Sequence, residues 1–369
     1  MKTSKLINTV RTLILENWLN EKAVEKLIEG ITRYGLENVS TLSKWVAIPV
    51  ETARYMIWEE LPKHNVSARI TVNLPRIGLG RWMLQITPTQ KSYTDGIETF
   101  LKDSAGPVYI GRVLPDNSSV SMLAIPFGEQ YKLREQLAHL RSSNIIESYS
   151  LDEVEWIRDI SLNPAMYDFK KSDWRHDWED LDKNRDPPIA PDAKEDQAPV
   201  VDYKDILILK ELQQNVPRTL SKLSKRIGLD QHNLRYHYKT HVRRAISGYY
   251  LRLIPQDSGK YHTSIIFSLE IQNEKSLVDA RSVSLRIPFT QKSWKTERDY
   301  CWLTRCPGEH TTSLLRYVNN KFMKIPGKLK VTYIDSQTEF FGTIPHTLFD
   351  EEKGIWKYEP KSAIQILKK

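Results

Sequence analysis

Apolar residues recur at helical spacing near residue 230, and polar residues fill the positions between them. Two short apolar rows follow each other there: Leu220, Leu223 and Ile227, then Leu234, Tyr238 and Val242. Gly228 interrupts the pattern between the rows, and Asp230 stands where a helix N-cap belongs. The pattern predicts two short helices joined by a tight turn, which is a helix-turn-helix.

Alternating and helical patterns then predict the order β-α-β-β-α-β twice along the chain. In the first half, the strand and helix patterns occupy 66–88 (two strands around a Pro/Gly turn, the place of a wing and an exit strand), 93–103, 107–126 (two strands), 129–141 and 144–151. In the second half they occupy 261–270, 273–283, 286–294, 299–305, 309–322 and 328–335. This order is that of a ferredoxin-like domain.

The two halves are related by a shift of 181 residues. The segment LSKWVAIPVETARYMIWEEL at 42–61 then aligns with LSKRIGLDQHNLRYHYKTHV at 223–242, with five identities in twenty positions. Under the same shift Gly78 meets Gly259, and Pro107 meets Pro288. This constant shift predicts that one unit occurs twice along the chain.

We therefore expect an α+β protein with two tandem copies of a winged helix-turn-helix followed by a ferredoxin-like βαββαβ domain. The expected segments are 1–20 (N-terminal amphipathic helix), 21–66 (first winged helix-turn-helix), 67–168 (first ferredoxin-like domain), 169–201 (flexible acidic and proline-rich linker), 202–247 (second winged helix-turn-helix) and 248–369 (second ferredoxin-like domain with a C-terminal extension). Trp174 and Trp178 are the exceptions in the linker, and we expect them to anchor it to the adjacent strand.

The net charge of +8 is concentrated in the second half, where residues 201–369 hold 29 Lys and Arg against 17 Asp and Glu. Such a charge attracts a polyanion. The sequence has no uncharged apolar run of the length of a membrane span and no signal peptide, so we expect a cytoplasmic protein without membrane contact.

The segment VDYKDILILKELQQNVPRTLSKLSKRIGLDQHNLRYHY at 201–238 resembles the Lrp/AsnC (feast/famine) family of transcription regulators, of the archaeal type. The residues that carry the likeness are Asp202, Asp205, Leu209, Leu212, Gln213 and Asn215. NLPRIGLG at 73–80 also looks like the family's wing turn. The resemblance implies ferredoxin-like domains that pair through their sheets and carry the helix-turn-helices onto DNA, here as a pseudo-dimer within one chain.

From this we predict a sequence-specific regulator of transcription that binds double-stranded DNA and is not an enzyme. The second helix-turn-helix would be the main reader. Its predicted contacts to bases and phosphates are Arg218, Thr219, Gln231, His232, Asn233, Arg235, Tyr236, Lys239, Arg243 and Arg244.

The first helix-turn-helix has an acidic face, since Glu51, Glu59 and Glu60 stand at or beside positions that are basic or neutral in the second. It would read bases through Thr52, Arg54 and Tyr55, bind a protein partner, or serve only as a scaffold. Two chains could also form a homodimer. We do not expect an amino-acid effector, because the turns LPDNSSVSML and WKTERDYCWL lack the glycine of the family's effector site.

An enzyme of the siroheme decarboxylase type is the alternative, because these enzymes resemble Lrp/AsnC proteins and use histidines near the wing and sheet. His262 lies in the matching strand of the second copy, where the first copy has Arg81. His237 and His241 have the i, i+4 spacing of a metal pair, but the sequence shows no third ligand. We therefore predict no metal site, no cofactor and no catalytic residue.

Overall fold

The computed structural model of the 369-residue chain describes residues 21–104, 106–169, 171–183, 200–254, 262–363 and 365. The amphipathic helix expected within 1–20 and the linker residues 184–199 lie outside this part of the chain. None of the helices in the described part has the length and apolar character needed to cross a lipid bilayer.

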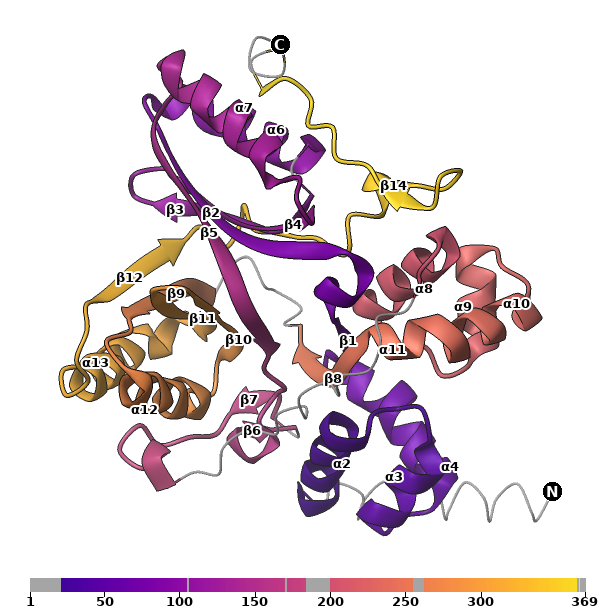
Figure 1. Ribbon diagram of the computed structural model, residues 1–369. Helices are drawn as coiled ribbons and strands as arrows, with labels where there is room; N and C mark the ends of the chain where they lie inside the picture. The colour runs from indigo at the N-terminus through magenta and orange to yellow at the C-terminus, as the bar shows by residue number, and fades with distance from the viewer. Residues whose placement is uncertain are drawn as a thin grey trace, which may run out of the picture.

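Two small helical heads follow the predicted helix-turn-helix pattern (Figure 1). The first consists of α2 (Glu21–Tyr34), α3 (Val39–Val46), α4 (Val50–Tyr55), the π-helix η1 (Met56–Glu60) and α5 (Leu61–Lys63). The second consists of α8 (Tyr203–Gln214), α9 (Leu220–Ile227), α10 (Gln231–His237), the π-helix η6 (Tyr238–Val242) and α11 (Arg243–Ala245). The N-cap prediction is confirmed, because Asp230 accepts hydrogen bonds from the backbone N–H groups of His232 and Asn233.

Each head is followed by a strand, and the two strands pair with each other across the chain. Strand β1 (Val66–Val72) lies antiparallel to β8 (Ile246–Leu253), with Arg69 opposite Tyr250. Helix α2 packs on β8, whereas α8 packs on β1, so each head rests on the strand of the other half. The hairpin of the expected wings does not form: β1 leads through the short helix η2 (Leu74–Ile77) into β2, and its hydrogen-bonded partner is β8.

Eight further strands close into a barrel. The first half contributes β2 (Leu79–Pro88), β3 (Pro107–Leu114), β4 (Ser119–Pro126) and β5 (Ile146–Asp159), and the second contributes β9 (His262–Glu270), β10 (Thr290–Thr296), β11 (Asp299–Pro307) and β12 (Leu329–Ile334). The hydrogen-bonded order is β12-β9-β11-β10-β5-β2-β4-β3, and an additional pairing of β12 with β3 completes the circle. The predicted mixture of helices and sheets is confirmed, and the strands of the two halves form one closed wall.

Helices α6 (Thr94–Ser104) and α7 (Gln130–Ser142) belong to the first half of the barrel, and α12 (Glu274–Arg286) and α13 (Thr311–Phe322) to the second (Figure 1). Each pair buries an apolar stripe against its half of the wall. A separate apolar cluster, which includes Met122, Trp294, Leu303 and Ile334, joins residues of both halves across the barrel.

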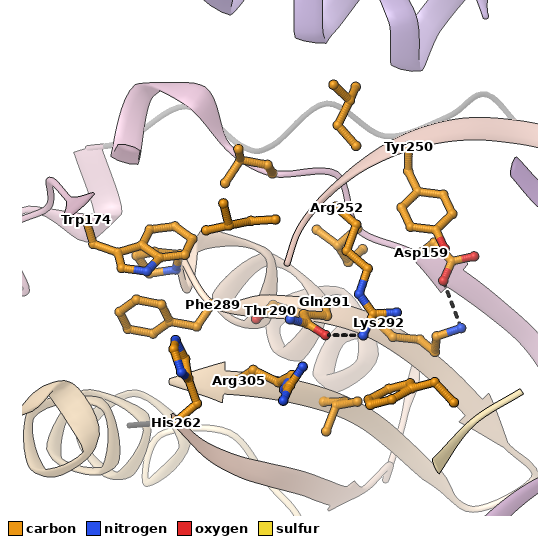
Figure 2. Close-up of a pocket in the computed structure, with 17 residues that line it drawn as sticks. Asp159, Trp174, Tyr250, Arg252, His262, Phe289, Thr290, Gln291, Lys292 and Arg305 are labelled. Carbon is orange, nitrogen blue, oxygen red and sulfur yellow. Dashed lines mark hydrogen bonds and ion pairs between the residues drawn. The ribbon is translucent and has the colours of Figure 1, made fainter. Parts of the chain in front are cut away.

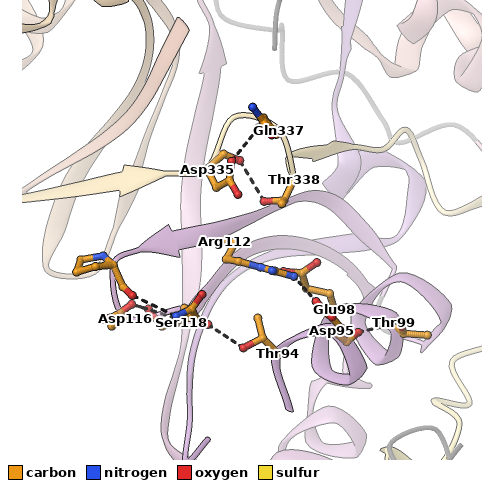
Figure 3. A network of polar contacts seen from close by, with 12 residues as sticks. Thr94, Asp95, Glu98, Thr99, Arg112, Asp116, Ser118, Asp335, Gln337 and Thr338 are labelled. Atoms are coloured by element: carbon orange, nitrogen blue, oxygen red, sulfur yellow. Dashed lines mark hydrogen bonds and ion pairs between the residues drawn. The ribbon is translucent and has the colours of Figure 1, made fainter. Parts of the chain in front are cut away.

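The seam between β3 and β12 is held by backbone and side-chain contacts (Figure 3). Asp335 N–H donates to the carbonyl oxygen of Arg112 over 2.8 Å. The guanidinium of Arg112 in turn contacts Glu98 at 2.8 Å and Asp95 at 2.5 Å, both on α6. Arg112 thus bonds to helix α6 with its side chain and to the second half with its backbone, next to the pairing of Val113 with Ile334 that closes the barrel.

The remaining segments cover the edges of these layers. They are η3 (Lys91–Tyr93), η4 (Pro164–Met166), β6 (Tyr167–Asp168), β7 (Asp173–Trp174), η5 (Leu181–Lys183), η7 (Gly308–His310), β13 (Phe340–Phe341), η8 (His346–Leu348), β14 (Phe349–Asp350) and β15 (Ile355–Trp356). Within 171–183, Trp174 and Trp178 pack against Phe289. The C-terminal segment returns to the first half, where Tyr358 is buried.

Candidate active site in the cavity between ribbon and barrel

A cavity of about 410 Å³ lies between the β1–β8 ribbon and the mouth of the barrel, within the usual range for small-molecule sites. A smaller cavity of about 50 Å³ adjoins it. Both are lined by Asp159, Tyr250, Arg252, Lys292, Leu303 and Phe341. We call the two together the ribbon cavity.

Strand alternation explains how polar side chains reach this cavity. On β8, Tyr249 and Leu251 are buried in the core of the heads, so Tyr250 and Arg252 point to the opposite face. On β1, Arg69 and Thr71 alternate with buried apolar residues in the same way. The ribbon therefore presents its polar face to the barrel.

Four cations line the ribbon cavity: Arg69, Arg252, Lys292 and Arg305. Asp159 is the one carboxylate among its lining residues, and it forms an ion pair of 2.8 Å with Lys292. Burial lowers the pKa of Arg69 and of Arg305, because desolvation disfavours the charged guanidinium. The cavity lining thus carries more positive than negative side chains, and a bound anion would balance this difference.

Aromatic rings and polar groups support these cations (Figure 2). The ring of Phe341 lies 4.6 Å from the guanidinium carbon of Arg252 and 5.6 Å from that of Arg305. Arg252 also donates to Gln291 over 3.3 Å. Arg305 is 3.5 Å from Glu339, whose side chain is only 1% exposed. The cations are thereby fixed in position before any ligand arrives.

His262 stands at the end of the ribbon cavity, between Phe289 and Arg305 (Figure 2). Its Nδ1 is buried and has no hydrogen-bond partner. Burial first, and then the charge of Arg305, lower the pKa of His262, so its imidazole is neutral at pH 7. Burial also raises the pKa of Tyr250 and of Tyr109, so both phenols keep their protons at that pH.

The thirteen residues predicted to contact DNA lie elsewhere. None of them lines the ribbon cavity. The exposed ones on or beside the second head are Arg218, Thr219, Gln231, His232, Asn233, Arg235, Tyr236, Lys239, Arg243 and Arg244, while Thr52, Arg54 and Tyr55 of the first head are half-buried.

Several of these residues form contacts inside the chain, because the two heads face each other. Arg218 lies 3.6 Å from Glu51 and 3.9 Å from Glu59 of the first head, and Arg243 lies 2.5 Å from Glu37. Trp58 also donates its indole N–H to the carbonyl oxygen of Val216 over 3.1 Å. The acidic face of the first head, for which a protein partner was one of three alternatives, is in part matched by Arg218 of the same chain.

Sequence patterns did not single out the four cavity cations, Arg69, Arg252, Lys292 and Arg305. Each is a charged residue in a strand pattern, and such positions usually face solvent. His262 is the one cavity residue that the sequence singled out, through the decarboxylase alternative. The available signal was an arginine between apolar neighbours in ARITV and in YLRLI, although the shift of 181 residues aligns Arg69 with Tyr250 and not with Arg252.

Two solved structures resemble this chain over nearly all of its length. A crystal structure of the siroheme decarboxylase NirDL in co-complex with an iron-uroporphyrin III analogue gives a TM-score of 0.53 at 9% sequence identity, with 93% of this chain and 97% of that chain covered. A second crystal structure of siroheme decarboxylase NirDL gives 0.52 at 11% identity, with 95% and 97% covered. No family model and no curated protein matches the sequence. At these identities the likeness shows the fold.

These findings correct the functional interpretation of the sequence. We expected an Lrp/AsnC-type transcription regulator, with double-stranded DNA as its partner and without enzymatic activity; the matched structures are those of an enzyme, one of them with a tetrapyrrole analogue. That prediction is wrong. Helical periodicity fixes which face of a helix packs on its own head, but it does not fix what the exposed face touches. The assignment of single residues to DNA contacts stays a prediction.

Proposed function

We propose that this protein is an enzyme that binds a carboxylate-bearing tetrapyrrole in the ribbon cavity and decarboxylates it. The observation that carries the proposal is the excess of cations in the cavity, with Arg69, Arg252, Lys292 and Arg305 against Asp159 alone among the lining residues. The similarity of fold to siroheme decarboxylase NirDL supports it.

Arginine suits this task because its planar guanidinium binds a carboxylate with two parallel hydrogen bonds. Uroporphyrin-type rings carry carboxylate side chains around their rim, so several separate cations match such a ligand better than one. Apolar and aromatic side chains, among them Trp294 and Phe341, line the same cavity and offer faces to a flat ring. A tetrapyrrole has a flat apolar ring and a charged rim, and the cavity offers a matching surface to each.

Decarboxylation breaks the bond between a carbon atom and its carboxylate, which leaves as CO2. The electron pair of that bond stays on the carbon and must receive one proton. We assign the delivery of this proton to His262, whose neutral imidazole can donate one N–H while its other nitrogen regains a proton. Loss of CO2 is favoured for a carboxylate that lies against the apolar lining of the cavity and away from its cations, because it is poorly solvated there.

The two halves of the chain are also alike in their organisation. We propose that residues 21–66 with 67–168, and 202–247 with 248–369, are two copies of one unit separated by the segment 169–201. The support is that both halves have the same element order, and that their barrel strands follow the same order of pairing. The two copies would form a pseudo-dimer within the chain. The expected cytoplasmic location stays a prediction.

Binding and turnover can be tested separately with purified protein. Iron-uroporphyrin III added in increments should produce a saturable change in its visible absorbance, and affinity should fall as salt rises, because the cavity contacts are ionic. Incubation with siroheme should then yield products that are lighter by the mass of CO2 in mass spectrometry. Absence of saturable binding would falsify the proposal.

A further inference from the structure

The second head contains a cluster of three metal-ligating side chains far from the ribbon cavity. Asp205 on α8 is fully buried, and His237 and His241 reach it from α10 and η6. His237 Nδ1 lies 2.9 Å from one carboxylate oxygen of Asp205, and His241 Nδ1 lies 2.9 Å from the other. One ligand atom from each residue lies within 4.8 Å of the others.

The matching positions of the first head have a different character. Under the shift of 181 residues, Asp205 corresponds to Val24 and His237 to Met56, both of which are buried apolar residues. His241 corresponds to Glu60. The first head therefore has two buried apolar residues and Glu60 at these positions, whereas the second has a carboxylate and two imidazoles. Burying a carboxylate in place of a valine costs stability unless it gains strong partners, and here two imidazoles and the capping box of α8 supply them.

We propose that Asp205, His237 and His241 form a binding site for a divalent transition metal ion, with Zn²⁺ as the first choice. Two imidazoles and one carboxylate are a ligand set that Zn²⁺ favours, and three protein ligands leave one position for water. Ligand atoms around a tetrahedral zinc ion at about 2.0–2.1 Å lie roughly 3.3 Å apart. The two separations of 2.9 Å join His237 and His241 to different oxygens of Asp205. A set with one ligand atom from each residue lies within 4.8 Å, so its widest separation must shorten by up to about 1.5 Å to reach that geometry.

The surroundings hold the ligands in place and leave one side open. The backbone N–H of Asp202 donates to the Oδ2 atom of Asp205 over 2.9 Å, which fixes the carboxylate as part of a helix capping box. The side chain of His241 is 24% exposed, whereas that of His237 is 8% exposed. An ion would therefore enter from the side of His241. Binding uses the lone pair on each Nδ1, so both rings would take the tautomer with hydrogen on Nε2.

A bound ion would join α8 to the π-helix η6. These elements are distant in sequence and meet in the core of the second head. Metal binding should therefore stabilise this head, because an ion that binds the folded state raises the free energy of unfolding. The first head, with Val24 and Met56, would have no such dependence.

Titration of the chelator-treated full-length protein with Co²⁺ tests the site. Co²⁺ occupies zinc sites and gives visible absorption when its coordination is tetrahedral. We expect one tight equivalent with that spectrum, its displacement by Zn²⁺, and a rise in thermal melting temperature with Zn²⁺. His241→Gln should weaken binding at least tenfold. His232→Gln, on the exposed face of the same helix, should bind as the wild type does.

A second variant keeps the test valid if single substitutions unfold the head. The double change Asp205→Val with His237→Met installs the residues of the first head, so it should fold and show no tight Co²⁺ equivalent. Failure of the wild type to bind one equivalent, or binding by this double variant as tight as that of the wild type, would overturn the metal site. Neither outcome depends on the ribbon cavity, so the site and the proposed function can fail independently.

Discussion

Asp159 at the end of β5 and Lys292 on β10 form an ion pair of 2.8 Å at the place where the two halves of the barrel meet under the ribbon. Thr71 of the ribbon donates to the same carboxylate over 2.6 Å. One carboxylate thus connects the first half of the barrel, the second half and the ribbon above them. Arg305 has its own partner in Glu339, so Arg69 and Arg252 are the cavity cations that remain for a ligand.

Asp159→Asn should make the protein less stable at neutral pH, by about 2 kcal/mol, because a buried ion pair is broken while Lys292 keeps some solvent contact. Burial by itself would raise the pKa of Asp159, but Lys292 and Thr71 favour the carboxylate, and the pKa is lowered overall. A lowered pKa contributes stability above the unfolded value of about 3.9, and this stability is lost as the pH falls through the folded pKa.

Urea unfolding of both proteins across pH 3 to pH 8 checks this. The wild type should lose its advantage over Asp159→Asn only below about pH 4. An advantage that stays constant down to pH 3 would show that the charge of Asp159 does not contribute.

Arg252→Gln should weaken binding of iron-uroporphyrin III about tenfold or more, since one charge-assisted hydrogen bond to a carboxylate is lost. Its salt dependence should also become shallower. Arg316→Gln, on the exposed surface of α13, removes the same charge at a distance from the cavity and serves as the control. Equal affinities of the two variants in absorbance titrations would place the ligand outside the ribbon cavity.

His262→Gln should bind iron-uroporphyrin III within about twofold of the wild type, yet release CO2 from siroheme at least a hundredfold more slowly, because the proton relay is removed. The buried Nδ1 without a partner is the feature that singles this residue out. Tyr93→Phe, a tyrosine of η3 outside the cavity lining, is a suitable control. If kcat of His262→Gln matched that of the control, another group would have to supply the proton.

Gly111→Ala should destabilise the seam of the barrel by about 1–3 kcal/mol, through overpacking. A Cβ atom at this position would lie 2.6 Å from the hydroxyl oxygen of Tyr109 and 2.7 Å from a methyl carbon of Ile334, which belongs to β12. Thermal unfolding followed by circular dichroism measures the loss. Val331→Ala, at a partly exposed site on β12, should change the melting temperature much less. Equal shifts would mean that the seam tolerates the added methyl group.

Local patterns were enough to predict much of the architecture. The apolar rows at 220–227 and 234–242, the N-cap at Asp230 and the two βαββαβ orders all appear in the structure. The closed barrel and the β1–β8 ribbon could not be predicted in this way. Strand alternation shows that one face of β1 is buried, but its hydrogen-bonded partner is some 180 residues away, and no local pattern records that pairing.

The sequence by itself determined the helices, the strands and their repeated order, because these depend on side chains a few positions apart. Only the tertiary structure decided that Arg69, Arg252, Lys292 and Arg305 face one cavity, and that Asp205 lies between His237 and His241. A charged residue in a strand has the same local pattern whether it faces water or a closed space. Whether such a residue faces water depends on which distant strand lies over it, and only the folding of the whole chain determines that.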